Sequence, residues 1–257
     1  MTGDFNRRQV LAAFGSVSLG ALLAACGSDG DGDSGTDVVT TDGDTTTVEP
    51  KTSSGAATAE LFDDSSSCTL AAEQTEGPYY FDADSIRSDI REDREGARLR
   101  LAVRVRDAGS CEPLRNAVVD VWHCDAVGVY SGFEAASTGA GGGPGGGRTD
   151  DERYLRGAQV TNSDGIAEFV TVYPGAYRGR TVHIHAKVHV DNQTALTTQF
   201  YFDEDVTGRV YARAPYSDRD GHDTTNSTDN LFDERLLLDV SRDGDGYVGA
   251  ISLDVQA

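Results

Sequence analysis

The sequence predicts an all-β fold class for residues 67–257, an antiparallel β-sandwich with long loops. Seven segments in this range alternate between apolar and polar residues or run apolar, and β-branched residues are frequent in them. Clusters of Asn, Asp and Gly separate several of these segments and are typical of hairpin turns. The range is long enough for one domain with a substantial core.

The seven predicted strands follow in chain order. They are residues 99–105, 117–122, 167–172, 181–190, 197–202, 236–240 and 247–255. The turn signals lie at residues 107–109, 162–165 and 243–246. Short strands punctuated in this way are typical of a β-sandwich.

The N-terminus predicts export. Arg7 and Arg8 precede an apolar run, residues 10–25, that is too short and too rich in Ala, Gly and Ser for a stable membrane span, so we interpret residues 1–26 as a twin-arginine (Tat) type signal. The run ends in Leu-Ala-Ala-Cys, which resembles a lipobox with Cys26 as the acylated residue. We therefore expect an exported, extracytoplasmic lipoprotein that is membrane-anchored only by its lipid; a plain signal peptide with an incidental cysteine is the alternative.

Residues 27–66 differ from the rest of the chain. They are rich in Asp, Gly, Ser and Thr with few apolar residues and no period, which predicts a disordered acidic linker. The whole chain carries a formal net charge of −21, and residues 67–257 are themselves acidic. Nucleic-acid binding is therefore excluded as a function class, because the phosphate backbone would be repelled.

Two histidines stand out within the predicted strand at residues 181–190. His183 and His185 are two residues apart, so on a strand they share one face at a spacing of roughly 6 to 7 Å, which suits two ligands of one metal ion. Such a pair is by itself weak evidence for a metal, because strand histidines are more often surface or hydrogen-bonded residues. The flanking motifs strengthen it.

Four motifs occur in a characteristic order, at residues 119–131, 173–177, 180–185 and 196–199. In order and spacing they resemble the intradiol ring-cleavage dioxygenases, the family of catechol, hydroxyquinol and protocatechuate dioxygenases. The resemblance covers roughly residues 70 to 202. It implies a β-sandwich core and a mononuclear, non-haem Fe(III) ion held by two tyrosinates and two histidines, which fall on Tyr130, Tyr177, His183 and His185.

The same resemblance implies roles for these side chains. Tyr177 would be the tyrosinate that leaves when a catechol binds and takes up one substrate proton, while Tyr130 would stay on the iron. Arg180 matches the family's active-site arginine, suited to stabilising negative charge on the ring. Gln199 matches a pocket glutamine on the substrate and O2 side. The phenolates explain why Fe(III) is favoured, since they are hard anionic ligands.

The implied reaction is cleavage of a catechol-type ring between its two hydroxyl-bearing carbons with O2, giving a cis,cis-muconate-type product. Residues 27–66 lack the amphipathic period of the catechol branch's helical dimerisation region, which favours a protocatechuate-type core. A homo-oligomer is left open. Residues 74–80 resemble a family segment that lines the substrate pocket, so Tyr79 and Tyr80 are candidate pocket residues.

Alternatives from other classes remain at this stage. One is a noncatalytic cell-surface β-sandwich binding module, and another is a histidine site for zinc or copper. His189 shares the parity of His183, but about 20 Å of strand separates them, so we leave it out of the ligand set. We assign no chemistry to Trp122 and interpret His123 as a supporting or structural histidine.

The glycine-rich insertion and the cysteines are two further features of the sequence. The glycine-rich residues 139–147 lack the Lys-Ser/Thr of a phosphate loop, and we interpret them as a mobile insertion near the mouth of the site. Three cysteines remain beyond Cys26, and export permits one disulfide. Cys111 and Cys124 lie at opposite ends of one predicted strand, so Cys68 must pair with one of them; we favour Cys124, because both segments approach the presumed site.

Overall fold

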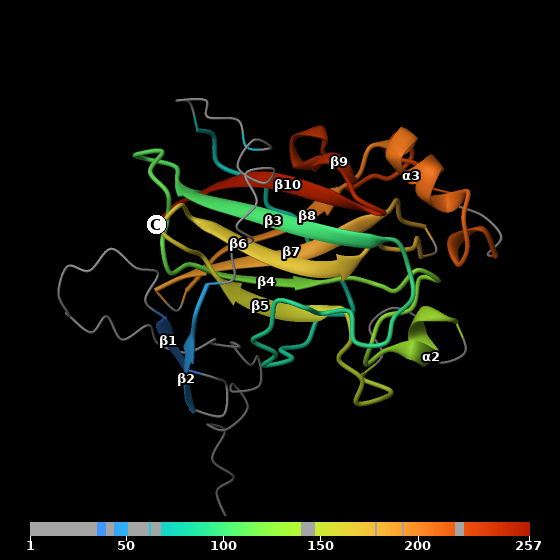
Figure 1. Cartoon of the computed structure of the whole chain (residues 1–257), viewed down its shortest axis with the longest axis horizontal. Helices are drawn as coiled ribbons and strands as arrows, with labels where there is room; N and C mark the ends of the chain where they lie inside the picture. Colours follow the sequence, from blue (N-terminus) through green and yellow to red (C-terminus); the bar gives the residue numbers. More distant parts are fainter. Residues whose placement is uncertain are drawn as a thin grey trace, which may run out of the picture.

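The structure is a computed structural model of the 257-residue chain, and it describes residues 35–39, 44–50, 62, 68–139, 147–177, 179–191, 193–218 and 224–257 (Figure 1). In these ranges two four-stranded sheets pack face to face. The first sheet has the order β6 (Ile166–Val172), β3 (Arg98–Asp107), β10 (Gly246–Val255), β9 (Asp239–Asp243). The second has the order β5 (Arg156–Val160), β4 (Val118–Trp122), β7 (His183–Val190), β8 (Gln193–Tyr201).

One strand pair differs from the expected topology. All neighbours in the two sheets are antiparallel except β3 and β10, which run parallel with Tyr247 opposite Leu99 and Val255 opposite Asp107. The prediction of a purely antiparallel sandwich is therefore wrong at this pair. Side-chain alternation has a period of two in either direction, so the pattern carries no information about the direction of the neighbour.

The core lies between the two sheets. On β3 the residues Leu99, Leu101, Val103 and Val105 are buried, and they belong to one cluster with Val119, Ile184, Phe200 and others from the second sheet. The intervening residues face outward. On β7 these outward residues are His183, His185, Lys187 and His189, so apolar alternation positions the two candidate ligands on the outer face of the second sheet.

Six of the seven predicted strands are confirmed with shifted ends. The seventh, predicted at 236–240, becomes η2 (Glu234–Leu236) and then β9, and β5 was not predicted. The described helices are short: α2 (Glu134–Ser137), α3 (Glu204–Tyr211), η1 (Tyr216–Asp218) and η2. Asp203 caps α3 by accepting from the amides of Asp205 and Val206. No helix of the described ranges is long and apolar enough to cross a membrane.

The expected disordered linker contains a hairpin. β1 (Thr36–Val39) pairs with β2 (Thr45–Val48), and the buried Val38 and Val48 pack on Val118, Ala158 and Val160 of the second sheet. The prediction of disorder for all of residues 27–66 is therefore wrong in this part, because two valines find an apolar patch to cover. The signal at residues 1–26, Cys26 included, and residues 140–146 of the glycine-rich insertion lie outside the described residues.

The disulfide joins Cys68 to Cys111, with an S–S distance of 2.08 Å. The predicted pair of Cys68 and Cys124 is wrong. The Cys68 sulfur lies 3.3 Å from the carbonyl oxygen of Ala108, in the turn that follows β3. Cys124 instead follows β4 at the other end of the sandwich, where its buried thiol donates to the Gly175 carbonyl at 3.1 Å.

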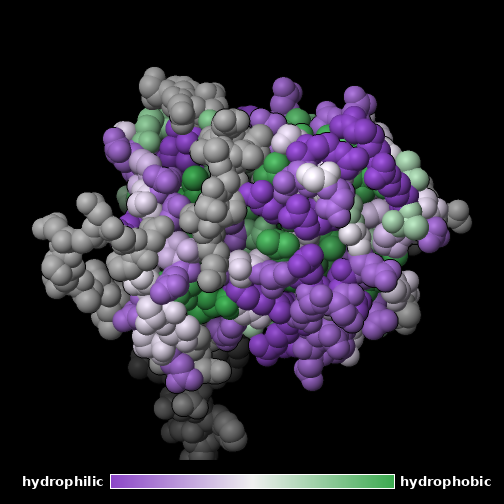
Figure 2. All heavy atoms as spheres, in the orientation of Figure 1, coloured by the Kyte–Doolittle hydropathy of each residue, from purple (hydrophilic) through white to green (hydrophobic). Residues whose placement is uncertain are grey.

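Hydrophilic side chains dominate the face of the molecule in Figure 2, and hydrophobic ones form small separate patches. Among the described residues the exposed large hydrophobics are Leu70 and Val127. This surface agrees with the acidic, polar composition of the chain.

Candidate functional site

The two histidines begin β7 and are almost fully buried, at 2% exposure for His183 and 1% for His185. Their Nε2 atoms lie 3.1 Å apart. Burial, and secondarily the Arg180 charge, lowers the pKa of His183 to about 3; burial and His183 lower the pKa of His185 well below its usual value. The neutral His183 ring donates from Nδ1 to the Thr181 carbonyl, 2.7 Å away, which leaves its Nε2 lone pair directed toward His185.

The two predicted tyrosine ligands lie against these histidines. The Tyr130 and Tyr177 rings are 5.4 Å apart between centroids, Tyr130 is 6.2 Å from His185, and Tyr177 is 5.4 Å from His183. Tyr130 is fully buried, and its hydroxyl has no hydrogen-bond partner among the described residues. The structure thus brings the four sequence-predicted ligands together at one end of the sandwich.

A close backbone contact joins the two loops that carry the tyrosines. The Gly175 amide donates to the Asp125 carbonyl at 2.9 Å, and a Cβ at Gly175 would lie 2.6 Å from the carbonyl oxygens of Asp125 and Ala126. Only glycine fits there. The Asp125 side chain also accepts from the amides of Val127 and Val129, which turns the chain back toward Tyr130.

Burial determines the pKa values of the two tyrosine phenol groups. It raises the pKa of Tyr130 well above its usual value, with Tyr177 adding to the effect, and it raises the pKa of Tyr177 to about 12 against the opposing Arg180 charge. Both phenols are therefore neutral in the protein alone. A cation bound between them would favour the phenolates, since a metal charge reverses this balance.

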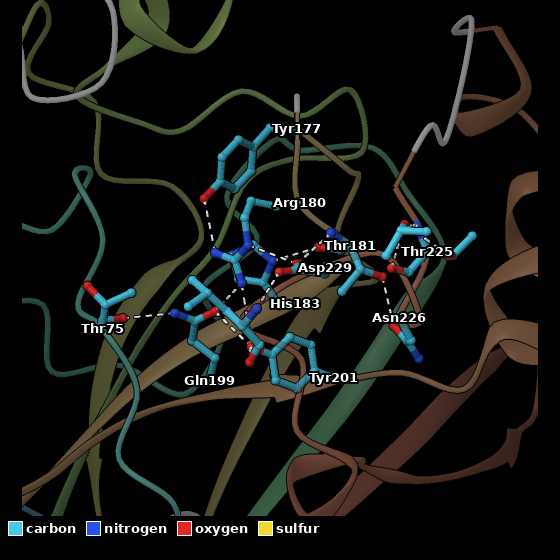
Figure 3. Close-up of polar contacts among 12 residues, drawn as sticks. Thr75, Tyr177, Arg180, Thr181, His183, Gln199, Tyr201, Thr225, Asn226 and Asp229 are labelled. Carbon is cyan, nitrogen blue, oxygen red and sulfur yellow. Dashed lines mark hydrogen bonds and ion pairs between the residues drawn. The ribbon is translucent and has the colours of Figure 1, made fainter.

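Arg180 lies at the centre of the polar contacts in Figure 3. Its Nε donates to Asp229 at 2.8 Å and its NH2 to the side-chain oxygen of Gln199 at 2.6 Å. Its NH1 lies 3.5 Å from both the Tyr177 hydroxyl and His183 Nε2. The guanidinium thus connects the predicted glutamine to two of the predicted ligands.

Residues 74–80 pass over the candidate ligands. The side-chain nitrogen of Gln199 donates to the Thr75 carbonyl at 2.8 Å. Gly77 has a φ of +75° and lies so close to His185 that a Cβ there would be 3.0 Å from the ring. Tyr79 packs on Tyr130 and Tyr177, at centroid distances of 4.8 and 5.9 Å. This segment therefore forms one wall of the site.

Tyr80 has a different environment from Tyr79. Its ring packs on Trp122 at 4.6 Å, its hydroxyl donates to the buried Asp120 at 3.1 Å, and the Lys187 ammonium lies 3.6 Å from its ring centre. These contacts place Tyr80 among the residues that support Trp122. We accordingly keep Tyr79, and not Tyr80, as the candidate pocket residue.

Sequence reasoning missed two residues of the site. Trp122, to which we assigned no chemistry, stacks on His185 with ring centroids 5.0 Å apart and planes 6° from parallel. Asp229 holds Arg180, and no local signal marked it, since it lies in a polar loop 30 residues after the last motif. Burial raises the pKa of Asp229, but the amides of Leu231 and Thr181 together with Arg180 outweigh it and leave that pKa below its usual value.

His123 and His189 lie outside the donor set. His123 contacts the Cys124 carbonyl and the Thr171 hydroxyl with its two ring nitrogens, at 2.8 and 2.7 Å, which agrees with a structural role. His189 pairs across the sheet with Val118, whereas His185 pairs with Trp122 at the opposite end of β4. Among the described residues no group of three or more His, Cys, Asp and Glu side chains is arranged to hold a metal ion.

Comparison with known proteins agrees with this geometry. The family model described as Dioxygenase matches residues 75–214. An intradiol ring-cleavage dioxygenase from Tetranychus urticae is 34% identical with a TM-score of 0.69, and the match covers 74% of this chain and 95% of that one. The chain belongs to the intradiol ring-cleavage dioxygenase family.

Other members are more distant. The dioxygenase domain of a dioxygenase and carbohydrate-binding fusion from Streptomyces sp. SirexAA-E is 29% identical with a TM-score of 0.54, covering 74% of this chain and 99% of that one. A chlorocatechol 1,2-dioxygenase of Rhodococcus opacus is 31% identical over 150 residues, which are 51% of this chain and 50% of the relative. The chain thus spans about half the length of the curated relatives that it matches.

Proposed function

We propose that this chain is a non-haem Fe(III) dioxygenase that opens catechol-type rings between the two hydroxyl-bearing carbons with O2, giving cis,cis-muconate-type products. The observation that supports it most is the convergence of the buried Tyr130 and the partly buried Tyr177 with two neutral histidines at one end of the sandwich. In this proposal Tyr130, Tyr177, His183 and His185 hold the iron.

The donor set fits a ferric ion. The Tyr130 hydroxyl is buried without a hydrogen-bond partner among the described residues, which is unfavourable for a polar group unless a ligand meets it. The imidazoles are neutral, as metal ligands must be. Two hard phenolates with two imidazoles favour Fe(III). When bound, the ion would act as a Lewis acid that favours the ionised forms of these phenols and of the substrate.

The two tyrosines are suited to different tasks. Tyr130 is fully enclosed, whereas Tyr177 is partly exposed and lies beside Arg180. Tyr177 is therefore the side chain that can swing away and accept a proton from the substrate hydroxyl on its own oxygen. Arg180, held from two sides, presents a fixed positive charge where the ring acquires negative charge. Gln199 holds Arg180 NH2 and is itself held by Thr75.

The test uses the purified chain loaded with Fe(III) and supplied with catechol under air. We expect a coloured protein from tyrosinate-to-iron charge transfer, uptake of O2, and the ultraviolet absorption of a muconate. Tyr177→Phe should keep its iron with a shifted band and bind catechol slowly. Tyr130→Phe should lose much of its iron and of its visible band. Full iron and an unaltered spectrum in both variants would refute the assignment, and a colourless, inactive protein would favour a binding module.

We also propose that the chain is exported and anchored by a lipid on Cys26, with catecholic substrates reaching it outside the cytoplasm. The support is the twin-arginine signal and the Leu-Ala-Ala-Cys sequence. Cys26→Ser should release the protein from the membrane fraction without changing the activity of the purified enzyme. Unchanged membrane retention in this variant would exclude the anchor.

A further inference from the structure

Residues 224–233 form a loop that reaches the site from the C-terminal part of the chain, beyond the 75–214 segment that matches the family model. Asn226 ties its first part to the sandwich: its side chain donates to the Phe202 carbonyl at 2.8 Å and accepts from the Thr181 hydroxyl at 2.7 Å. The Tyr201 hydroxyl donates to the Leu231 carbonyl at 2.7 Å. The loop is thus fastened on both sides of Asp229.

Asp229 is buried at 8% exposure and uses both carboxylate oxygens. Oδ2 accepts from Arg180 Nε at 2.8 Å and from the Thr181 amide at 2.9 Å, while Oδ1 accepts from the Leu231 amide at 2.8 Å. Two of the three contacts are therefore made to backbone. They fix the carboxylate independently of the arginine, so the carboxylate can orient the arginine.

The Arg180 side chain has few other constraints. Gln199 holds one terminal nitrogen at 2.6 Å. Among the described residues, the nitrogen that faces Tyr177 and His183 has two contacts, both at 3.5 Å, the limit of a hydrogen bond. A guanidinium is planar, so fixing Nε and NH2 also fixes the direction of NH1. Asp229 is in addition the carboxylate that pairs with this largely buried cation, which would otherwise be costly to keep there.

We propose that Asp229 is a positioning residue for Arg180: it holds the Nε edge of the guanidinium, and together with Gln199 it directs NH1 at the substrate side of Tyr177 and His183. This inference rests on the proposed function and deepens it, since it adds Asp229, which lies beyond the matched segment, to the residues that orient Arg180. Small displacements of such a group lower the rate strongly, because its charge must already be in place when the reaction occurs.

The main experiment compares Asp229→Asn, which keeps the shape and removes the charge, with Asp233→Asn in the same loop. Asp233 pairs with the exposed Arg235, so its variant controls for a change in loop charge. In the iron-loaded enzyme we expect Asp229→Asn to lower kcat for catechol by about 10- to 100-fold and to change KM by less than about threefold, because a misplaced charge weakens the transition state more than substrate binding. Iron content and visible band should stay those of the wild type, and Asp233→Asn should be within about twofold of it.

A double-mutant cycle identifies the route of the effect. If Asp229 acts through Arg180, Asp229→Asn should have little further effect on kcat in an Arg180→Ala background. Equal fold-losses in both backgrounds would overturn the inference. Asn226→Ala loosens the loop without touching its charge; a loss of kcat as large as that of Asp229→Asn would assign the effect to loop folding and would also overturn it.

A readout without turnover separates this inference from the proposed function. In 15N spectra of the metal-free full chain, the Arg180 Nε–H should be protected from exchange in the wild type and in Asp233→Asn, and should lose that protection in Asp229→Asn. Protection together with no catechol turnover would refute the dioxygenase proposal and leave the positioning intact. Unchanged protection in Asp229→Asn would refute the positioning, whatever the enzyme does.

Discussion

The outer faces of the two sheets have the same alternating pattern but different chemistry. On the first sheet the outward residues of β3 include Arg98, Arg100 and Arg106, and they pair with Asp243 and Asp254. On the second sheet the outward residues of β7 are His183, His185, Lys187 and His189, beside Trp122 and Asp120 of β4. Residues 74–80 cover this second face near the histidines.

The difference shows how a covering segment changes the exposure and the pKa values of the polar side chains beneath it. The Arg98–Asp243 pair of the first sheet keeps partial access to water, with 33% and 28% side-chain exposure, although the Arg106–Asp254 pair is buried. On the second sheet His183 and His185 are buried, together with Tyr130 from a neighbouring loop, and burial lowers the pKa of His183 and raises that of Tyr130. A surface pattern of the same period thus becomes an ion-pair face in one sheet and a candidate ligand site in the other.

The largest expected effect is on the covered face. Arg180→Ala should lower the turnover of catechol by about a thousandfold, because a fixed cation next to developing negative charge contributes this much in comparable sites. Iron content and colour should be nearly unchanged, and Arg180→Lys should recover little of the rate, since an ammonium lacks the planar fork. Steady-state kinetics and iron analysis measure both. Arg100→Ala on the first sheet is the control and should keep wild-type turnover; the comparison fails if both arginines behave alike.

The second-largest expected effect is the loss of stability when the disulfide is removed. Cys68 begins the segment that leads to the covering residues, and Cys111 follows β3 of the first sheet, with a sequence separation of 43. Replacing both by Ser should lower the free energy of unfolding by about 2–4 kcal/mol, as expected when a loop of this size is no longer closed in the unfolded chain. Urea unfolding of the wild type with and without reductant should give the same difference. Cys124→Ser, outside any disulfide, should change stability by much less than the double variant.

Asp120 should make stability depend on pH. Burial raises its pKa to about 7, with Asp82 adding to the shift, and Tyr80, Arg156 and Lys187 oppose it. The folded value exceeds the unfolded one of about 4, so the native state holds the proton more tightly, and this stabilisation is full below about pH 4 and lost as pH rises through 7.

Asp120→Asn removes this contribution while keeping a neutral side chain. Relative to the wild type, the variant should gain about 2 kcal/mol between pH 4 and pH 8, about half the upper limit from linkage because buried groups relax. Urea unfolding at several pH values from 4 to 8 measures the difference between the two proteins. A difference that does not change with pH would contradict the prediction.

The smallest effect should be on the first sheet. Asp243 pairs with Arg98 at 2.9 Å and Arg100 at 3.2 Å in a half-exposed setting. Asp243→Asn should lower the free energy of unfolding by less than about 1 kcal/mol, and high salt should reduce the difference further. Thermal unfolding at low and high salt measures it. If Asp243→Asn lowered the free energy of unfolding as much as the cysteine replacements do, the ion pairs of the first sheet would contribute more to stability than we expect.

Local pattern was sufficient where the strands alternate strongly. β3, β7 and β10 were predicted because their apolar residues recur every second position and are in fact buried together. β5 was missed because its face toward residues 74–81 carries Arg156, whose burial depends on contacts with Tyr79 and Ser131 that the local sequence does not contain. β1 and β2 were missed because only two valines distinguish them from a polar linker.

Most candidate site residues could be named because they lay in motifs. Trp122 also lies in a motif, but the motif did not reveal that its ring stacks on His185. The four candidate ligands, Arg180 and Gln199 could be named because the spacing of the motifs resembles that of a family. Asp229 belongs to no motif, and the partner of Cys68 depends on which turn lies beside it, a long-range property. The parallel alignment of β3 with β10 is of the same kind, since it is decided by how the last strand enters the sheet.

Gly175 has a consequence for the geometry of the two tyrosines. Its backbone touches the loop of Asp125 and Ala126 so closely that any side chain would push the two tyrosine-bearing loops apart. A single methyl group there would thus alter the distance between Tyr130 and Tyr177 without changing either of them. The position therefore couples the separation of the two candidate tyrosine ligands to the main chain.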